Sequence, residues 1–290
     1  MRIDQDGQSG IKRELWSSGD LFKISRSPQR NDVIQQLVYR VYTRHLQSKI
    51  LQGPLPRHVA VILDGNRRFA ESTGYPSVSL GYRQGAHKVS QLLEWCQDLR
   101  IPQVTLWVLS TDNLKRPPEQ LQSLCQVIEE EIIGIANGQQ ESRTPRQIRF
   151  FGQLDGLAPS LRESLHRASE ITGTYDQYYL NIGVAYGGRE EIVHAVRELL
   201  ESYDRQGVCL KEVASRVSVA EIESHLYLKG IPEPDLIIRT SGEVRLSGFL
   251  LWQSVYSEFY FCDAYWPAFR KLDLLRAIRS FQQRKRRFGR

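Results

Sequence analysis

The sequence predicts an α/β fold with a mainly parallel sheet, because short apolar runs alternate with amphipathic segments along most of the chain. Runs such as residues 59–63 and 104–109 are rich in β-branched residues and have the length of a buried strand. Between them, apolar residues recur at helical spacing, as in residues 89–99. Strands that alternate with helices in this way form parallel sheets.

The expected strands are short and apolar, and polar or turn residues bound most of them. They cover residues 59–63, 104–109, 148–151, 178–184, 236–238 and 259–261. The expected helices carry apolar residues on one face and cover residues 33–51, 89–99, 118–132, 159–171, 190–203, 220–228 and 272–283. Pro117 and Pro118 mark the start of one of them, because proline fits the first helical turn, where its missing N–H costs no hydrogen bond.

The chain contains 290 residues, which allows one large domain or two small ones. No linker rich in Pro, Gly or Ser divides it and no internal repeat is present, so we expect one domain after an N-terminal extension of about 50 residues. The helix over residues 33–51 would pack on that domain. A helix lying on a membrane surface is the alternative, because basic residues lie between its apolar ones.

No window approaches the roughly 18 uninterrupted apolar residues that a transmembrane helix needs. The polar N-terminus lacks the apolar core of a signal peptide. We therefore expect a cytoplasmic protein with at most peripheral membrane contact. The four cysteines, Cys96, Cys125, Cys209 and Cys262, are not spaced like a zinc or thioredoxin motif and are expected to be scattered, buried thiols.

The net charge of +6 suggests anionic partners, namely nucleic acid, lipid headgroups or phosphorylated small molecules. Part of the excess lies in the terminal run Arg284, Lys285, Arg286, Arg287 and Arg290, which alone is typical of a solvated tail. No RNA-binding motif and no face of basic and aromatic residues is evident in the sequence, so a nucleic-acid partner is not expected. A gel shift that depends on salt would test that alternative.

Three polar loops follow three of the expected strands, at the end where ligands gather in open α/β sheets. Residues 64–68 read Asp-Gly-Asn-Arg-Arg, residues 110–116 offer hydroxyls, an amide and two cations, and residues 239–248 offer two arginines, three hydroxyls and two glycines. One such loop is often only capping chemistry, but three at equivalent strand ends indicate a site for more than one phosphate. The P-loop motif of nucleotide enzymes is absent.

Asp64 would repel a phosphate unless a cation accompanied it. Gly65 lets backbone N–H groups approach an anion, and Arg67 and Arg68 can hold phosphate oxygens. A Mg²⁺ ion that bridges the carboxylate and a diphosphate would remove the conflict. The loop also suits a helix N-cap, since Asp and Asn both favour that position, and composition leaves the two interpretations open.

Four segments resemble the signature motifs of cis-prenyltransferases, the family that includes undecaprenyl diphosphate synthases. They are residues 58–70, residues 109–117, residues 186–189 (Tyr-Gly-Gly-Arg) and residues 235–258, in the family's order and with compatible spacing. The ending Arg287-Phe288-Gly289 resembles the family's C-terminal Arg-x-Gly. The resemblance implies a catalytic domain over residues 55–290 after an extension over residues 1–54. It also implies a six-stranded, mostly parallel sheet with a hydrophobic tunnel, a homodimer and dependence on Mg²⁺.

The resemblance implies that isopentenyl diphosphate condenses with an allylic prenyl diphosphate to form a Z double bond. Asp64 and Asn113 would be the catalytic residues, and Asp64 and Glu258, the latter from the partner subunit, would bind the metal. Because an amide is a poor base, a diphosphate oxygen or water remains an alternative to Asn113 as proton acceptor. The substrate-binding residues would be Gly65, Asn66, Arg67, Arg68, Phe69, Tyr82, Ser110, Thr111, Asp112, Leu114, Arg116, Arg239, Arg245, Leu246 and Ser247.

Several positions depart from the motifs of long-chain members. Arg67 replaces a common glycine, Tyr82 and Val244 replace histidines, and Leu114 replaces an aromatic residue. These changes look most like the short-chain branch, which makes Z,E-farnesyl diphosphate from geranyl diphosphate. Val108 stands where long-chain enzymes often have alanine, and its larger side chain would block a growing product in the tunnel. Val108 also suits a strand by its β-propensity alone.

Two alternatives remain. A long-chain polyprenyl diphosphate synthase would share every motif and differ in product length. A non-catalytic accessory subunit of a heteromeric prenyltransferase would keep the fold but lose the catalytic aspartate, and the presence of Asp64 disfavours it.

Overall fold

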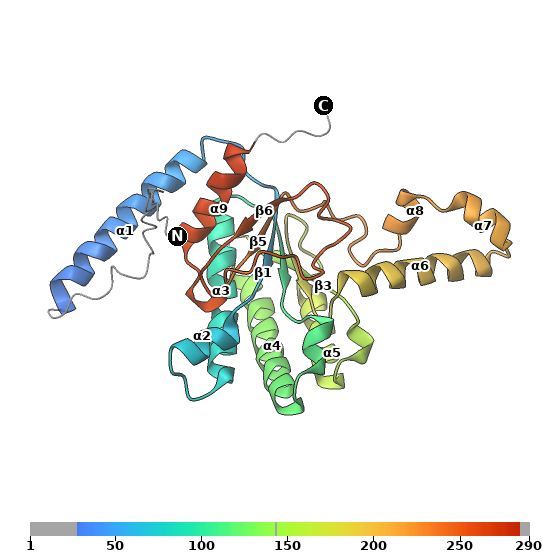
Figure 1. Ribbon diagram of the computed structural model, residues 1–290, viewed down its shortest axis with the longest axis horizontal. Coiled ribbons are helices and arrows are strands. Elements are labelled where there is room, and N and C mark those ends of the chain that lie inside the picture. The colour runs from blue at the N-terminus through green and yellow to red at the C-terminus, as the bar shows by residue number, and fades with distance from the viewer. Residues whose placement is uncertain (1–27, 143, 285–290) are drawn as a thin grey trace, which may run out of the picture. The chain divides into compact units, whose positions relative to one another are not determined.

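Six strands form one sheet, and each corresponds to a short apolar run of the sequence (Figure 1). The structure, a computed structural model, describes residues 28–142 and 144–284. The strands are β1 (His58–Ile62), β2 (Gln103–Trp107), β3 (Arg146–Phe151), β4 (Tyr178–Gly183), β5 (Leu236–Arg239) and β6 (Glu258–Phe261). All neighbouring strands pair in parallel in the described part of the chain, so the expected α/β fold is confirmed.

The strand order β3-β4-β2-β1-β5-β6 places β1 between β2 and β5. Strands β1, β2 and β5 are buried along their whole length, as expected for a parallel sheet covered on both faces. Ile62, near the end of β1, pairs with Trp107 on one side and with Arg239 on the other. The three polar loops therefore leave the sheet side by side at its carboxyl edge, where the strand order reverses and ligands bind in such folds.

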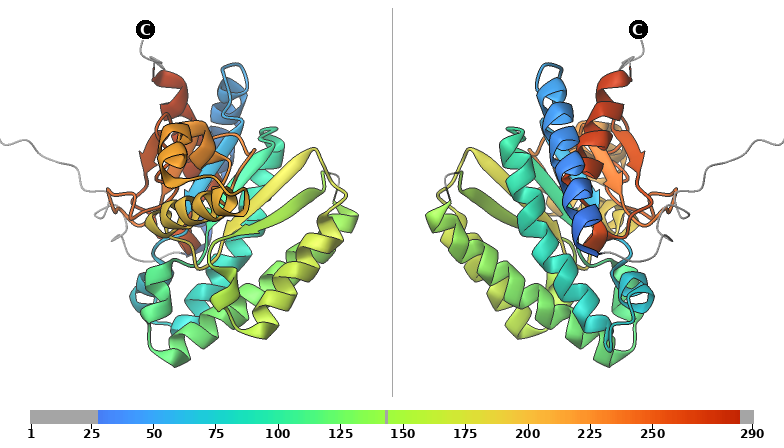
Figure 2. Two further views of the ribbon diagram at one scale, coloured as in Figure 1. Left: turned by 90° about the vertical axis from the view of Figure 1, so that its right-hand side faces the viewer. Right: turned by 90° about the vertical axis from the view of Figure 1, so that its left-hand side faces the viewer.

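Helices precede and connect the strands. They are α1 (Pro28–Ile50), α2 (Asn66–Ser72), α3 (Val78–Asp98), α4 (Pro118–Gly138), α5 (Pro159–Thr172), α6 (Gly188–Arg205), α7 (Leu210–Arg216), α8 (Val219–Glu223) and α9 (Lys271–Gln283). Helix α3 packs against α4, and α4 against α5 (Figure 2). Helices α6, α7 and α8 form an arm that extends away from the sheet (Figure 1), with a small apolar cluster of Leu199, Tyr203 and Val213.

The chain separates into two compact units, residues 1–42 and residues 43–290. Helix α1 confirms the expected helix over residues 33–51, and its last turns belong to the second unit, where Thr43, Leu46 and Ile50 are buried. The expected boundary between residues 54 and 55 stays a prediction. Among the helices described, none is long and apolar enough to span a bilayer.

Three expectations about local structure were wrong. Residues 66–68 are the first turn of α2 rather than part of a loop. The helix expected over residues 220–228 ends at Glu223, and α7 was not expected because only Val213 of its seven residues is buried, too few to produce a periodic pattern. Cys96 and Cys262 are buried thiols as expected, but Cys125 is only half-buried and Cys209 is exposed just before α7.

His58, the first residue of β1, contacts the segment before β5 and the neighbouring strand β2. Its Nδ1 lies 2.7 Å from the carbonyl oxygen of Pro232, and its Nε2 lies 2.7 Å from the Thr105 hydroxyl oxygen, which accepts from the Asn181 amide. One neutral tautomer satisfies both contacts, with Nδ1–H donating and Nε2 accepting. Burial lowers the pKa of His58 to about 4, and the bond to Pro232 and the charge of Asp235 offset this only in part.

Because folded His58 binds its proton only below about pH 4, whereas the unfolded chain binds it near the ordinary value of 6.5, protons favour unfolding between those pH values. We expect the free energy of unfolding to rise by about 2 kcal/mol from pH 5 to pH 7.5 through this residue. Urea unfolding at both pH values measures it. His58→Gln should flatten that part of the dependence, and an unchanged pH dependence in the variant would contradict the assignment.

Candidate active site

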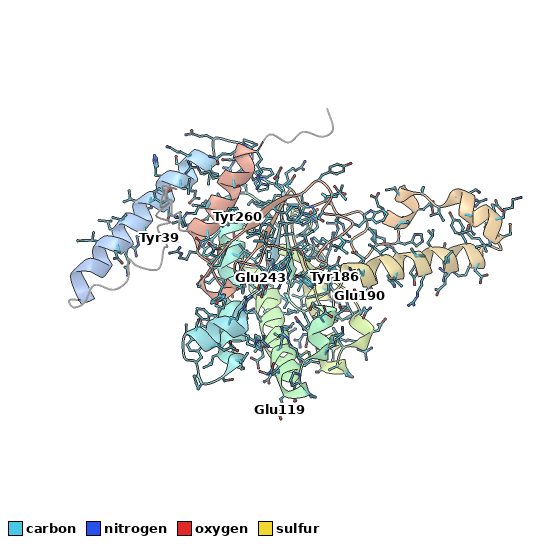
Figure 3. All side chains as sticks on the ribbon, viewed as in Figure 1. Tyr39, Glu119, Tyr186, Glu190, Glu243 and Tyr260 are labelled. Atoms are coloured by element: carbon cyan, nitrogen blue, oxygen red, sulfur yellow. The ribbon has the colours of Figure 1, made fainter. Side chains whose placement is uncertain are left out.

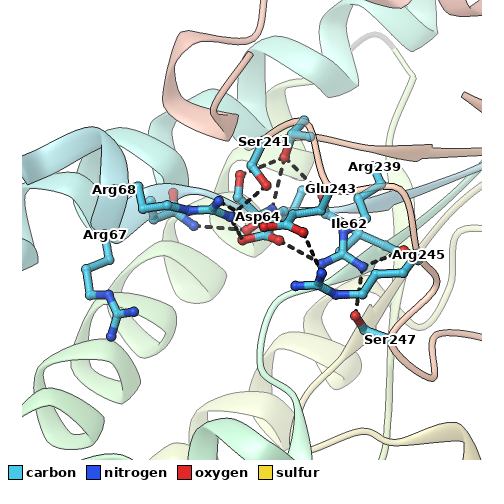
Figure 4. A network of polar contacts seen from close by, with 12 residues as sticks. Ile62, Asp64, Arg67, Arg68, Arg239, Ser241, Glu243, Arg245 and Ser247 are labelled. Atoms are coloured by element: carbon cyan, nitrogen blue, oxygen red, sulfur yellow. Dashed lines mark hydrogen bonds and ion pairs between the residues drawn. The ribbon is translucent and has the colours of Figure 1, made fainter. Parts of the chain in front are cut away.

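Asp64 lies two residues beyond β1, at the centre of a network of arginines (Figure 4). Arg239, the last residue of β5, donates from Nη2 to Asp64 Oδ2 at 2.9 Å. Arg68, on the first turn of α2, donates from Nη2 to Asp64 Oδ1 at 3.1 Å. Each carboxylate oxygen thus faces a different guanidinium, and two loops far apart in the sequence meet on one aspartate.

The network fixes the charge of Asp64. Burial alone would raise the pKa of this carboxyl group, but the hydrogen bond and charge of Arg239, followed by the charge of Arg68, outweigh burial and hold the pKa below its ordinary value. The Arg239 side chain is only 5% exposed, and the Asp64 side chain is 28% exposed. Asp64 is therefore an anion that remains open to solvent on one side, with a buried cation behind it.

A second carboxylate extends the network outward. Glu243 accepts from Arg68 Nη1 at 3.1 Å and from Arg245 Nη1 at 2.6 Å. Arg68 also donates to the Ser241 hydroxyl at 2.8 Å and lies over the ring of Tyr265. Three arginines and two carboxylates therefore alternate at the carboxyl edge of the sheet, and Figure 3 shows Glu243 well separated from Glu119 on the first turn of α4.

The loop between β5 and β6 adopts strained backbone conformations around these groups. Ser241 has φ of 79°, Ser247 of 51° and Leu250 of 46°, values that side chains other than glycine rarely adopt. Arg239 Nη1 donates to the Ser247 hydroxyl at 2.7 Å and to the carbonyl oxygen of Arg245. Such strain collects where a site needs particular side-chain positions, and here it turns the loop back over the buried guanidinium.

Gly65 lets the chain turn from Asp64 into α2. Its φ of 102° is open to glycine, and a Cβ at this position would lie 2.6 Å from the ring of Tyr265 and 3.1 Å from Ser241 Cβ. A side chain would therefore both strain the backbone and push apart the two segments that hold Arg68.

The second polar loop forms a short 3₁₀-helix, Thr111–Lys115, next to this network in the sheet order. Ser110 and Asn113 form a reciprocal capping box: the Ser110 hydroxyl accepts from Asn113 N at 3.1 Å, and Asn113 Oδ1 accepts from Ser110 N at 3.2 Å. The Asn113 side chain is thus engaged with the backbone, which leaves its amide nitrogen to meet a ligand. Asp112 is exposed and pairs with Lys115 instead.

Arg116 connects this loop to an apolar pocket. It donates from Nη1 to the hydroxyl of buried Tyr82, at 3.2 Å, and Tyr82 lines the pocket together with Asn66 and Leu63. The rest of the lining comes from α3, α4, the sheet and the segments after β2 and β6: Gly85, Ala86, Val89, Leu106, Val108, Leu124, Val127, Ile128, Glu131, Ile132, Ile135, Ile182 and Trp266. A cationic edge therefore opens onto an apolar space beneath the first turn of α2.

The structure brings together some of the expected site residues and separates others. It gathers Asp64, Arg68, Arg239, Arg245 and Ser247 into the network, and Gly65 and Leu246 lie on its loops. Thr111, which donates its backbone N–H to the Tyr186 carbonyl oxygen, and the half-buried Leu114 belong to the second loop. The half-buried ring of Phe69 meets Tyr75.

Arg67 and Glu258 lie outside the network. Arg67 is exposed, 3.9 Å from Glu71, and points away from the other arginines in Figure 4. Glu258 begins β6, beside Leu236 at the amino edge of the sheet, and pairs with Arg284 at 2.6 Å. Because parallel strands keep the two edges apart, Glu258 and Asp64 of one chain cannot bind one metal ion. The expected Arg287–Gly289 motif lies outside the described residues.

Sequence reasoning missed Thr240, Ser241, Glu243 and Tyr265 as site residues. Thr240, Ser241 and Glu243 lie in a loop that the polar composition did indicate, but nothing in the sequence shows which side chains turn inward. Tyr265 follows β6, and the same strand-end rule would have found it had the loop after residues 259–261 been included.

The donor set fits a magnesium ion held with a diphosphate rather than a metal site built by protein alone. Within the described ranges, no cluster of three or more Asp, Glu, His or Cys side chains could hold a metal ion. Mg²⁺ usually binds through one or two carboxylates together with substrate phosphates and waters. Asp64 supplies one ionised carboxylate with a solvent-facing side, beside arginines suited to phosphate oxygens.

Comparison with known proteins agrees with this geometry. A family model described as "Putative undecaprenyl diphosphate synthase" matches residues 62–289, most of the chain and all of its polar loops. This chain belongs to the cis-prenyltransferase family. The expected resemblance and the enzyme class that it implied, a cis-isoprenyl diphosphate synthase, are therefore confirmed.

Relatives within the cis-prenyltransferases differ in the products that their names give. A (2Z,6E)-farnesyl diphosphate synthase of Thermobifida fusca is 49% identical over 87% of this chain and 97% of its own length. A tritrans,polycis-undecaprenyl-diphosphate synthase (geranylgeranyl-diphosphate specific) of Methanopyrus kandleri is 45% identical over 87% and 92%. The crystal structure of lavandulyl diphosphate synthase from Lavandula x intermedia has a TM-score of 0.76 and 32% identity over 81% of this chain and 99% of that one.

Thr240 anchors the backbone of Asp64 in this cis-prenyltransferase. Its fully buried hydroxyl accepts from Asp64 N at 3.0 Å and donates to the Asp64 carbonyl oxygen at 2.7 Å. We expect Thr240→Val to lower the free energy of unfolding by about 1–3 kcal/mol, because a buried N–H loses its acceptor. We also expect kcat/KM to fall by roughly tenfold or more, because Asp64 loses its position.

Urea unfolding and a prenyl-transfer assay measure the two effects. Thr240→Ser is the matched control, since it keeps the hydroxyl and should stay close to the parent in both measurements. A Val variant that stays close to the parent in both measurements would contradict this role of the hydrogen bonds.

Proposed function

We propose that this cis-prenyltransferase is a Mg²⁺-dependent, short-chain enzyme that makes Z,E-farnesyl diphosphate from geranyl diphosphate and isopentenyl diphosphate. The observation that carries the proposal is the meeting of an arginine-rich edge with a narrow apolar pocket. Only about 60 Å³ of that pocket is open to the centre of a water molecule, whereas ligand pockets measure about 300–1,000 Å³. The walls must therefore separate to admit even a short prenyl tail, and a long one has little room.

The arginine network suggests how diphosphates bind. Arg68, Arg239 and Arg245 pair with the carboxylates of Asp64 and Glu243 at the carboxyl edge of the sheet. Diphosphate oxygens suit the same guanidinium groups and carry more charge, so they would replace the carboxylates as acceptors. The Asp64 carboxylate would then be free to bind Mg²⁺ beside the allylic diphosphate, where the ion supplies further stabilisation of negative charge.

The reaction needs charge stabilisation more than it needs a base. The allylic C–O bond breaks with the electron pair leaving on diphosphate, which the guanidinium groups stabilise, and the isopentenyl double bond attacks the allylic carbon. A proton then leaves the new chain. Asn113 is held by its capping box and is an amide, so we assign it to orienting the substrate, and a diphosphate oxygen or water accepts the proton.

A homodimer is the second part of the proposal. Val193, Val196 and Leu200 form an exposed apolar stripe along α6, at spacings of three and four residues. Apolar surface of this kind commonly marks an interface. Asp64 and Glu258 lie at opposite edges of one sheet, so a metal site that used both carboxylates would need two copies of the chain.

The proposal is tested by product length. With Mg²⁺, labelled isopentenyl diphosphate and geranyl diphosphate, we expect a fifteen-carbon Z product with little further growth, resolved by chromatography after dephosphorylation. Chelation with EDTA should abolish incorporation, and added Mg²⁺ should restore it, because the arginines alone leave much of the diphosphate charge unbalanced. Long polyprenols would favour the long-chain alternative. No incorporation by folded protein, with any primer, would favour an accessory subunit.

Val108 gives a sharper test of the short-chain assignment. It follows β2, lies half-buried, and faces the apolar pocket from the side of the sheet. We expect Val108→Ala to raise the ratio of longer products to the fifteen-carbon product by roughly tenfold, because a narrow apolar site discriminates by that much per methylene or more. Ile237→Val is the control and should leave product length unchanged, because Ile237 is buried in the apolar cluster of Trp107 and Phe249 and does not line the pocket.

A further inference from the structure

The apolar pocket contains one charged side chain among the described residues that line it. Helix α4 contributes Leu124, Val127, Ile128, Glu131, Ile132 and Ile135, which recur every three or four residues on the face that closes the pocket. Glu131 therefore occupies a position that the helix otherwise gives to Leu, Ile or Val. A carboxylate is the side chain least suited to a surface that covers hydrocarbon.

The two residues before Glu131 are also glutamates, and each has a polar partner outside the pocket. Glu129 accepts from the Ser164 hydroxyl at 3.1 Å, and Glu130 pairs with Arg83 at 2.7 Å. In the described part of the chain, no hydrogen bond or ion pair is formed by the half-buried Glu131 carboxylate. Burial raises the pKa of Glu131, and the charge of the exposed His87 on α3 opposes this only in part. Keeping this carboxylate here costs stability, which suggests that it serves function.

The position of a residue along α4 indicates how far it lies from the diphosphate-binding edge of the sheet. Helix α4 follows β2 and precedes the parallel strand β3, so it runs from the carboxyl edge of the sheet back towards the amino edge. Among the residues that line the pocket, Leu124 therefore lies nearer the carboxyl edge than Glu131 does. Glu131 follows Leu124 by seven residues, or roughly 10 Å of helix. A prenyl tail that grows from the arginine network thus meets Leu124 first and Glu131 deeper in the pocket.

We propose that the Glu131 carboxylate is a polar barrier that limits product length in this enzyme. This proposal rests on the short-chain function proposed above and assigns it a second determinant. A tail that stops short of Glu131 leaves its carboxylate partly hydrated, whereas a longer tail covers it and removes that water without offering a donor. Val108 restricts the pocket by volume from the sheet, and Glu131 restricts it by desolvation from the helix. The two effects are separable by substitution.

The test compares Glu131→Gln and Glu131→Leu with Glu130→Leu, a matched control that removes a charge from the next residue on the solvent side. Gln keeps the shape and removes the charge, whereas Leu removes the polarity as well. The first measurement is binding without isopentenyl diphosphate, so that no turnover is needed. Dissociation constants for geranyl diphosphate and geranylgeranyl diphosphate are determined for each protein in the presence of Mg²⁺.

We expect Glu131→Leu to improve binding of the twenty-carbon ligand relative to the ten-carbon ligand by at least tenfold, with Glu131→Gln between it and the parent and Glu130→Leu unchanged. With isopentenyl diphosphate, the same order should appear in the ratio of longer products to the fifteen-carbon product. A parent protein that makes no product would overturn the proposed function. The ratio of the two dissociation constants would still show whether Glu131 disfavours the longer tail. Equal ratios in all four proteins would overturn the barrier, as would an equal shift in Glu130→Leu.

Discussion

The contact on which the site depends is the ion pair between Asp64 and Arg239. Arg239 ends β5 and is nearly inaccessible to solvent, so its charge must be compensated inside the protein. Asp64 follows β1, the neighbouring strand, and supplies that compensation. Leaving one partner of such a pair buried alone costs several kcal/mol, typically about 3–5. The need to neutralise this guanidinium holds together two loops that are separated by more than half of the chain.

The same pairing prepares the arginines for a different anion. A guanidinium that already faces a carboxylate has lost most of its side-chain freedom and is partly desolvated, so a diphosphate that takes the carboxylate's place meets a preorganised donor. The strained backbone at Ser241 and Ser247 contributes to this preorganisation, since it directs hydroxyl groups onto Arg68 and Arg239. The free energy stored in that strain is supported by the buried core on either side, including Phe249 and Leu250.

Much of the fold could be predicted from sequence because it depends on local patterns. Continuous apolar runs identify β1 and β2, since both faces of a parallel sheet are covered, and Pro118 correctly marks the start of α4. The short helix α7 and the end of α8 could not be predicted, because these segments bury too few side chains to show a period. In the site, Asp64 and Arg239 were predicted from their places after strands, and the structure confirms that their side chains meet. The inward turn of Ser241 and the approach of Tyr265 to Gly65 depend on backbone conformations and contacts across the fold, which composition does not encode.

The protein's own groups occupy both halves of the site. The arginines are neutralised by carboxylates of the protein, and the apolar pocket is too small for a prenyl tail. A diphosphate head and its tail must therefore displace internal partners at the same time, the head by exchanging anions and the tail by parting α3 and α4 from the sheet. The free energy of replacing the carboxylates by a diphosphate is about the same for every primer. The free energy of opening the pocket, in contrast, grows with each isoprene unit that enters. Selectivity for chain length is thus expected to come from the pocket walls, in particular from Val108 and Glu131, and affinity for the diphosphate from the arginine network.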